Sequence, residues 1–524
     1  MAGRGDGGGG RRPRAVFMAF GTQGDVFPIA ALAAAFARDQ QQYAVVFITH
    51  SAHRSLTAHL EGGNVRYIPV SSPPVLAAEQ IENISCDSTQ LNHEHGSFSL
   101  RKKAIQMEHR KECLSCVEEI FGDDTSITGD FIAINFFALE GWHLAELFQV
   151  KCIVAAPYFI PYSAPATFER QFKHTFPLLY KYFQEAPTNT VCWMDIIHWM
   201  WALFMESWES WREDCLNLSP IPFTDPVTNL PLWHVREESP LLLYGFSKEI
   251  VECPGYWPSS AHSCGFWSLP MAWQFSCDKC MELSRDINSS FGDILCSNHS
   301  SLDHFLIGSS YSSRPIFVGL SSIGSMGFLR NPKAFLMVLK VAIETSDYRF
   351  ILFSSGYQPL DSAIQAIASS IIESSEVDTS CGDSTLLFNG RLFCFSGSIP
   401  YSWLFPRCAA AIHHAGSGST AAALLAGIPQ VVCPFLLDQF YWAERLHWLG
   451  VAPEPIQRQH LIPDNNDSSS IHNAADVLLG TISSALSPEI KAQATRIAYR
   501  LSHEDGVGEA LRILKETVLT QNKT

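Results

Sequence analysis

Residues 411–446 read AIHHAGSGSTAAALLAGIPQVVCPFLLDQFYWAERL, which is an apolar strand, a loop of small residues, an alanine-rich helix and a second apolar strand. Unbroken apolar strands that alternate with helices are typical of parallel sheets covered on both faces. The stretch therefore predicts a β-loop-α-β unit of an α/β domain. Ligands of such domains bind at the carboxyl ends of the strands, so we expect the chemistry of this segment there.

The same alternation occurs twice along the chain. It runs from residue 15 to about residue 250 and restarts near residue 314, and the 524 residues are too many for one hydrophobic core. Residues 251–270 are rich in Pro, Gly, Ser and aromatics without periodicity, which indicates a linker. The sequence thus predicts two doubly wound, Rossmann-like domains that face each other across a cleft. The predicted units are a disordered leader at 1–14, a first domain at 15–255, a second domain at 256–490 with its linker at about 251–270, and a helical end at 491–524.

The net charge and the hydropathy of the chain disfavour some kinds of binding partner. The net charge is −16, from 52 acidic and 36 basic residues, which argues against nucleic acid and against electrostatic attraction to an anionic membrane surface. Residues 1–14 contain no apolar core of a signal peptide, and we find no apolar run of the roughly 18 residues that a membrane span requires. We therefore expect a cytoplasmic protein whose cysteines are reduced.

Three groups of residues raise the question of a metal. Cys113/Cys116 and Cys277/Cys280 are Cys-x-x-Cys pairs, but about 160 positions separate them, unlike the short spacing of a zinc ribbon. The run His93–His95 lies in a polar, Ser/Asn-rich stretch, where we expect a solvated loop. We expect no metal from these patterns.

The loop at 415–419 suits a phosphate group. Its small residues let the backbone approach an anion, and the N–H groups at the start of the next helix stabilise negative charge. His414 and the hydroxyl of Ser419 or Thr420 would add hydrogen-bond donors. Tight helix-strand packing with core histidines explains the loop equally well, because a glycine-rich turn alone is a weak motif.

The next strand supports a sugar nucleotide as the ligand. Asp438 and Gln439 follow it and reach the same edge of the sheet, where a carboxylate and an amide can bind vicinal sugar hydroxyls. A diphosphate site beside a site for sugar hydroxyls predicts a nucleotide-sugar-binding domain.

A family resemblance rests on three segments. Residues 403–456, WLFPRCAAAIHHAGSGSTAAALLAGIPQVVCPFLLDQFYWAERLHWLGVAPEPI, resemble the nucleotide-sugar signature of the sterol 3-beta-glucosyltransferase family. GTQGDVFP at 21–28 resembles that family's amino-terminal motif, and YGFSKEIVECPGYWPSSAHSCGFW at 244–267 resembles its interdomain segment. The resemblance implies a GT-B fold, with an acceptor-binding first domain, a donor-binding second domain and a last helix that crosses back to the first.

The resemblance also implies an activity. This is the inverting transfer of glucose from UDP-glucose to the hydroxyl of a sterol or other apolar acceptor, without a metal cofactor and with peripheral contact to membranes. Asp25 matches the family's general base, and its alternative is an ordinary helix cap. The residues expected to bind the donor are Thr22, Gln23, Ser322, Ser398, Ile399, His413, His414, Ser417, Gly418, Ser419, Thr420, Asp438 and Gln439.

Some positions depart from the family pattern. Ser321 and Ala415 stand where glycine is usual, and Gln23 replaces an arginine, which removes a positive charge near the phosphates. These departures keep a second hypothesis open, that of a non-catalytic protein that binds a lipid or a nucleotide sugar. A nicotinamide dehydrogenase is disfavoured because GTQGDV lacks the G-x-G-x-x-G fingerprint. The tryptophan-rich residues 193–211 could line an acceptor site, but we favour an ordinary core or an interface stripe for most of them.

Overall fold

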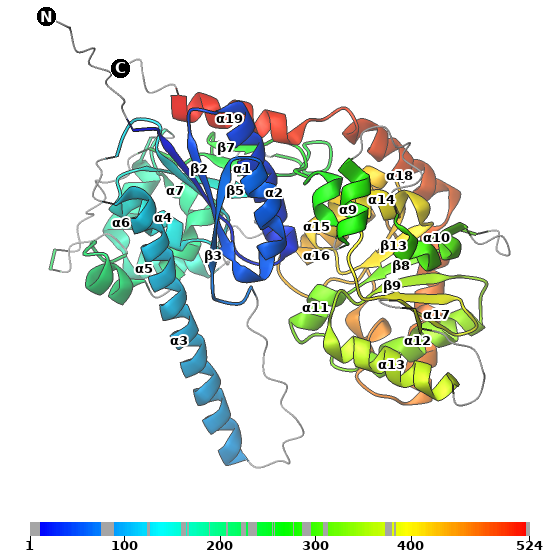
Figure 1. Cartoon of the computed structure of the whole chain (residues 1–524). Coiled ribbons are helices and arrows are strands. Elements are labelled where there is room, and N and C mark those ends of the chain that lie inside the picture. The colour runs from blue at the N-terminus through cyan, green and yellow to red at the C-terminus, as the bar shows by residue number, and fades with distance from the viewer. Residues whose placement is uncertain are drawn as a thin grey trace, which may run out of the picture.

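The computed structural model contains two lobes, each built around one sheet with helices on both faces (Figure 1). The structure describes residues 11–74, 88–122, 126–158, 164, 167–187, 189–205, 208–221, 227–228, 238–253, 255, 257–275, 277–285, 295–307, 313–372, 380–381 and 384–519. None of the helices in these ranges is long and apolar enough to span a bilayer.

The sheet of the first lobe is parallel throughout, in the order β3-β2-β1-β4-β5-β6-β7. The order reverses direction between β1 and β4, and ligands of such folds bind beside that point. The strand β7 comes from the segment that we expected to be linker, so the first sheet extends past residue 255. The strands are β1 Arg14–Met18, β2 Ala44–His50, β3 Val65–Val70, β4 Phe131–Ile134, β5 Lys151–Ala156, β6 Leu242–Tyr244 and β7 Ala261–Ser263.

One helix of the first lobe overturns an expectation. The run His93–His95 lies inside the long helix α3, so the expected loop is wrong. This stretch contains no proline, and the low helix propensity of Ser and Asn is too weak to terminate the helix. The helical segments of this lobe are α1 Gln23–Asp39, η1 Ser51–Leu56, α2 Thr57–Gly62, α3 Ser88–Phe121, α4 Glu140–Leu147, α5 Phe168–Thr175, α6 Pro177–Glu185, α7 Trp193–Asp195, η2 Ile196–Met200, α8 Trp201–Met205 and η3 Trp211–Cys215.

The tryptophan-rich segment belongs mainly to the core, as we expected. Trp193, Trp199, Trp208 and Trp211 are all buried in the hydrophobic cluster of the first lobe. These side chains therefore stabilise the lobe by removing apolar surface from water, and an acceptor would have to meet other residues.

The sheet of the second lobe runs β10-β11-β12-β9-β8-β13-β14. Its pairs from β12 to β14 are parallel, and β10 and β11 add an antiparallel edge. The edge comes from the Ser/Asp-rich insert near residues 369–387. The strands are β8 Ile316–Gly319, β9 Phe350–Phe353, β10 Ser380–Cys381, β11 Ser384–Leu387, β12 Leu392–Phe395, β13 Ala410–His413 and β14 Gln430–Val432.

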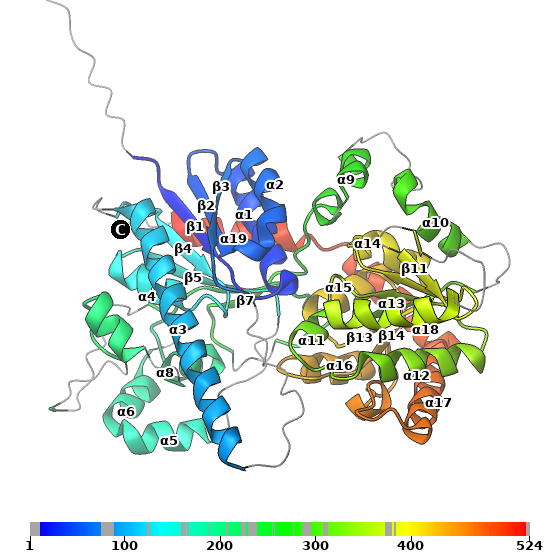
Figure 2. The ribbon, with the colours of Figure 1, turned by 60° about the horizontal axis from the view of Figure 1, so that its bottom comes forward.

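The helices of the second lobe cover both faces of this sheet (Figure 2). The helix α15 ends at Gly427, whose left-handed φ of 69° suits glycine. The helical segments are η4 Met271–Gln274, α9 Asp278–Arg285, η5 Ser297–His299, α10 Ser300–Ile307, α11 Ser321–Ser325, α12 Pro332–Glu344, α13 Gln358–Ile372, α14 Tyr401–Leu404, η6 Phe405–Arg407, α15 Ser417–Ala426, α16 Gln439–Trp448, η7 Arg458–His460, α17 Ser468–Ala485 and α18 Pro488–Leu501.

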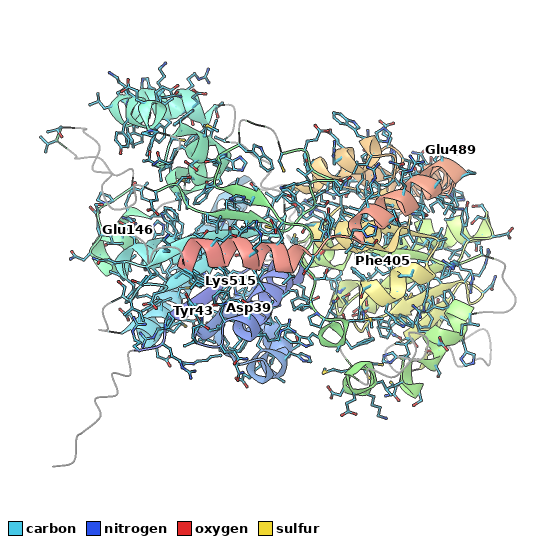
Figure 3. The ribbon with its side chains drawn as sticks, turned by 90° about the horizontal axis from the view of Figure 1, so that it is seen from above. Asp39, Tyr43, Glu146, Phe405, Glu489 and Lys515 are labelled. Carbon is cyan, nitrogen blue, oxygen red and sulfur yellow. The ribbon has the colours of Figure 1, made fainter. Side chains whose placement is uncertain are left out.

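The last described helix, α19 (Gly506–Leu519), returns to the first lobe (Figure 3). Its apolar residues join the core cluster that covers α1, and Lys515 Nζ lies 2.9 Å from Asp39 Oδ2. At the start of α19, Trp267 Nε1 donates a 3.1 Å hydrogen bond to the Gly506 carbonyl. A Cβ at Gly506 would lie 2.5 Å from the carbonyl carbon of Gly265, so the two backbones touch there.

Candidate active site

Asp25 is fixed by the turn that starts α1. The backbone N–H and the hydroxyl of Thr22 both donate to Asp25 Oδ2, at 2.7 and 2.8 Å. Gly21 has a φ of +105°, and a Cβ there would lie 2.6 Å from the same oxygen, so this position requires glycine. The capping role that we weighed for Asp25 is therefore present, but it occupies Oδ2, and we see no hydrogen bond to Oδ1 within the described residues.

Asn135 supports this turn from the neighbouring strand. Its Nδ2 donates to the carbonyls of Phe20 and Asp25 at 2.8 and 3.2 Å, and its Oδ1 accepts from the N–H of Phe20. The residue is buried directly after β4, at the carboxyl edge of the sheet. Asn135 was not predicted as a site residue, although its place after an apolar strand was a usable signal.

The pKa of the Asp25 carboxyl group is raised toward neutral pH. Burial raises its pKa from 3.8 to about 6, and the hydrogen bonds from Thr22 offset part of that effect. A carboxylate with a pKa near the working pH is well suited to accept a proton in catalysis.

His413 is a structural residue of the second lobe. Its Nδ1 accepts from the N–H of Ala415 at 3.0 Å, and its Nε2 lies 2.9 Å from Gln430 Oε1. Burial lowers its pKa to about 3, so the ring is neutral. With both nitrogens bonded inside the lobe, His413 shapes the loop and has none left for the direct donor contact that we expected.

His414 and Thr420 each hold a buried polar atom without a partner among the described residues. These atoms are His414 Nδ1 and Thr420 Oγ1, while His414 Nε2 lies 3.4 Å from Ser322 Oγ. Burial lowers the pKa of His414 to about 4, and the backbone of Gly319 offsets part of that effect, so the ring is neutral in this state. Buried polar groups without partners are rare because they are costly, so both residues are candidates for ligand contacts.

The start of α15 faces the first lobe. Gly416 precedes the helix, Ser417 begins it, and Gly418 is exposed. A Cβ at Gly418 would lie 3.7 Å from the Cα of Gly24, which shows that the first turn of α1 faces this helix end. The helix end thus combines exposed N–H groups with a position opposite the predicted base. On the next residue of α15, the Ser419 hydroxyl opposes the effect of burial, which raises the pKa of Tyr401 to about 12.

Asp438 and Gln439 lie at the start of α16. Asp438 Oδ2 accepts a hydrogen bond from Trp442 Nε1 at 3.0 Å. Gln439 Oε1 accepts from the N–H groups of Phe435 and Leu436, so its amide oxygen orders the loop. Burial raises the pKa of Asp438 from 3.8 to about 7, and the charge of Asp25 raises it further. Asp25 and Asp438 therefore lie close enough to interact across the lobes.

The other predicted donor residues are more dispersed. Ile399 is buried, which leaves only its backbone for a ligand, and Ser398 Oγ donates to the carbonyl of Gln274 at 3.5 Å. Gln23 is exposed at the start of α1 next to Thr22. The structure thus brings Asp25 to the helix end near Gly418 and to Asp438, while the expected nucleobase contacts remain a prediction.

An aromatic surface lies beside Asp25, and the sequence analysis did not identify it. Tyr158 OH accepts from the N–H of Phe136 at 3.1 Å, and its ring lies 5.7 Å from that of Phe137. Burial raises the pKa of Tyr158, and the charges of Asp25 and Asp438 contribute in the same direction. Phe137 is 45% exposed. These aromatics follow β4 and β5, so their position at the carboxyl edge was a signal that could have found them.

Comparisons with known proteins agree with this architecture. The family "Erythromycin biosynthesis protein CIII-like, C-terminal domain" matches residues 389–495. A sterol 3-beta-glucosyltransferase of Arabidopsis thaliana is 25% identical over 510 residues, covering 95% of this chain and 67% of that protein. One of Saccharomyces cerevisiae is 25% identical over 505 residues, covering 94% of this chain and 34% of that protein. The chain thus spans about two thirds of the plant relative and a third of the yeast one.

A solved structure gives the fold. The calicheamicin glycosyltransferase CalG4 matches with a TM-score of 0.53 and 14% sequence identity, covering 98% of this chain and all of that one. The GT-B fold is therefore confirmed, with two Rossmann-like lobes. The resemblance to sterol 3-beta-glucosyltransferases is confirmed over nearly the whole chain.

Proposed function

We propose that this chain, a GT-B protein similar in sequence to the sterol 3-beta-glucosyltransferases, transfers glucose from UDP-glucose to the hydroxyl of a sterol or sterol-like lipid. The observation that carries the proposal is the close approach of the two lobes beside Asp25, where a Cβ at Gly418, at the start of α15, would lie 3.7 Å from the Cα of Gly24. Asp25 and Asp438 come from opposite lobes, and the charge of Asp25 adds to the effect of burial in raising the pKa of Asp438. A site shared between two lobes can hold a donor on one side and an acceptor on the other.

The proposed reaction is a single displacement. Asp25 accepts the proton of the acceptor hydroxyl through Oδ1 while that oxygen attacks the anomeric carbon. Thr22 keeps the carboxylate in place through its two hydrogen bonds to Oδ2. The bond to the UDP oxygen breaks as the new one forms, so an α-linked donor gives a β-glucoside.

The second lobe would hold the donor. The N–H groups at the start of α15 stabilise the departing diphosphate, and His414 and Thr420 supply the buried polar atoms that lack partners. Asp438 and Gln439 would bind the glucose hydroxyls. In this arrangement the helix end stabilises the leaving group, and we propose that the reaction needs no metal ion.

The aromatic surface beside Asp25 favours an apolar acceptor. Phe137 presents a partly exposed ring next to Tyr158. The charge of Asp25 contributes to the raised pKa of Tyr158. A flat, apolar ring system gains free energy by covering such a surface. We further propose a cytoplasmic location with peripheral contact to membranes, where such acceptors are found.

The test combines an acceptor panel with one variant. The chain is incubated with UDP-glucose and a set of sterols and phenols, and UDP release and a hexose mass gain are measured. Asp25→Asn keeps the shape and the hydrogen-bond acceptor for Thr22, so transfer should fall about 10²- to 10⁴-fold with UDP binding retained. Asp476→Asn, on the exposed face of α17, is the matched control. Undiminished turnover of Asp25→Asn would contradict the proposed base.

One observation supports the second hypothesis, a non-catalytic binding protein. Ala415 adopts a left-handed φ of 61° at a position where the family pattern has glycine. This residue lies in the loop between His414 and α15, so strain there could change how the donor is held. Binding of UDP-glucose without UDP release, for every acceptor on the panel, would favour this hypothesis.

A further inference from the structure

A cluster of three cysteines and one histidine lies outside the site described above. Cys277, Cys280, Cys296 and His299 follow the pattern Cys-x2-Cys-x15-Cys-x2-His. Cys277/Cys280 lies far from Cys113/Cys116 in the sequence, and its nearer partner pair, 16 to 19 residues beyond Cys280, was not predicted. A pair of short ligand motifs with this separation is typical of structural zinc sites.

The four side chains converge on one point. One ligand atom from each residue lies within 4.8 Å of all the others. Cys277 Sγ and Cys296 Sγ are 3.7 Å apart, and His299 Nδ1 lies 3.2 Å from Cys280 Sγ and 3.4 Å from Cys296 Sγ. A tetrahedral zinc ion with ordinary bond lengths places two sulfurs about 3.8 Å apart and a sulfur and a nitrogen about 3.6 Å apart. The three distances of 3.7, 3.2 and 3.4 Å are close to those edges.

The surroundings suit a closed structural site. Cys280, Cys296 and His299 are buried, and Cys277 is partly buried. The N–H of Cys296 points to Cys280 Sγ at 3.3 Å, a bond that stabilises a thiolate ligand. The ring of His299 packs against Phe395 at 5.7 Å. Four protein ligands fill the tetrahedron, so no position is left for a substrate.

We propose that Cys277, Cys280, Cys296 and His299 bind one zinc ion as a structural site. Zinc is the favoured metal because it accepts mixed thiolate and imidazole ligands in tetrahedral geometry. Binding releases the thiol protons, and no electron transfer is involved. A disulfide is the competing explanation, but the sulfurs of Cys277 and Cys296 are 3.7 Å apart, whereas a disulfide needs about 2.05 Å.

The ion would join two segments on the same side of the second lobe. Cys277 and Cys280 lie at the start of α9, and Cys296 and His299 lie just before α10. Figure 2 shows these two helices on the same side of the second lobe. Gln274, three residues before Cys277, accepts the hydrogen bond from Ser398. The zinc site therefore anchors the chain as it enters the second lobe, next to the loop that follows β12. This inference does not depend on the proposed transfer activity.

The direct test is the metal content of the full chain. Elemental analysis by mass spectrometry should find one zinc per chain, and X-ray absorption should find three sulfurs and one nitrogen around it. Cys280→Ser and His299→Ala should each lower the zinc content well below one. The double variant Cys113→Ser/Cys116→Ser removes the other Cys-x-x-Cys pair and should keep one zinc, which makes it the matched control.

Two further measurements keep the test decisive if Cys280→Ser does not fold. Cobalt(II) exchanged into the unaltered chain should give the charge-transfer bands of thiolate ligands, and a chelator should lower the melting temperature of both the unaltered chain and the control variant. Chain produced with zinc in the medium but holding none, or holding a Cys277–Cys296 disulfide by mass, would overturn the proposal. So would a zinc content that Cys280→Ser leaves unchanged.

Discussion

Trp442 Nε1 donates a 3.0 Å hydrogen bond to Asp438 Oδ2, one turn back along the chain at the start of α16. The indole is fully buried, and its ring lies 6.1 Å from that of Phe246 in the first lobe. The packing between the lobes therefore helps to orient a carboxyl group that we assign to the sugar. If the indole N–H were removed, Asp438 would lose this orientation, and its pKa would rise further because the hydrogen bond from Trp442 lowers it.

Trp442→Phe makes that change while keeping an aromatic ring. We expect the KM for UDP-glucose to rise about tenfold, because one hydrogen bond to a charged group contributes about 1.5 kcal/mol. The affinity for UDP, which has no glucose, should change little. Isothermal titration with both ligands separates these effects. The control is Trp208→Phe, whose buried indole lies in the core of the first lobe. If Trp442→Phe lost affinity for UDP and for UDP-glucose equally, the assignment of Asp438 to the sugar would be contradicted.

The pH dependence of transfer should show the raised pKa of Asp25. The base must be ionised to accept a proton, and burial raises its pKa from 3.8 to about 6. We therefore expect kcat/KM to rise with pH through about 6, well above the range of an ordinary carboxylate. Because Asp438 titrates nearby, the apparent value belongs to the pair. A profile that stays flat down to pH 4.5 would rule out this ionisation as the one that limits the rate.

The free energy of unfolding should decrease as pH rises, whereas kcat/KM should increase. Asp438 has a pKa of about 7 when folded, raised from 3.8, so the folded state binds its proton more tightly than the unfolded state. The stability that it contributes is fully present below pH 3.8 and is lost as pH rises through 7. Asp438→Asn should therefore raise the melting temperature at pH 8 more than at pH 5, measured by calorimetry. The exposed Asp476→Asn should show no such difference between the two pH values.

Thr420→Val tests the buried hydroxyl at the start of α15. The shape is kept, and the hydroxyl that has no partner among the described residues is removed. We expect the melting temperature to rise, because an unsatisfied buried polar group destabilises the fold. Affinity for UDP should fall, roughly tenfold, if the hydroxyl binds the diphosphate. Thr481→Val is the control, since that hydroxyl bonds to the Val477 carbonyl. A Thr420→Val variant that is more stable and binds UDP unchanged would remove Thr420 from the site.

Phe137→Ala tests the aromatic surface beside Asp25. Removing a ring that is 45% exposed should raise the KM for the acceptor about tenfold and leave the KM for UDP-glucose unchanged. Leu178→Ala alters another exposed apolar side chain of the first lobe and should change neither constant. Steady-state kinetics with each substrate varied in turn gives both constants. An equal effect of the two variants would mean that the acceptor binds elsewhere.

Local patterns predicted the elements well because each strand and helix carries its own periodicity. The apolar runs before Gly21 and before His413 became β1 and β13, and Gly427 ended α15 as a left-handed residue suggests. The three-residue strand β7 was missed because so short a segment has no periodicity of its own and depends on its neighbour β6.

The site was predicted in part for a similar reason. Asp25 and Asp438 could each be identified from the strands and loops next to them, but their interaction depends on how the lobes pack. The role of His413 could not be known before its partner Gln430, 17 residues away, was placed beside it. Phe137 and the cysteine-histidine cluster could have been predicted, because Phe137 follows an apolar strand and the cluster has the spacing Cys-x2-Cys-x15-Cys-x2-His.

The contact between Gly265 and Gly506 has a mechanical consequence. The chain leaves the first lobe just after β7 and re-enters it just before α19, and both passages run through this one place. Two covalent links therefore join the lobes at a single point, and a hydrophobic cluster shared by both lobes, which includes Trp442 and Phe246, packs them together beside it. A side chain at Gly506 would press on the backbone of Gly265 and force these two crossings of the chain apart.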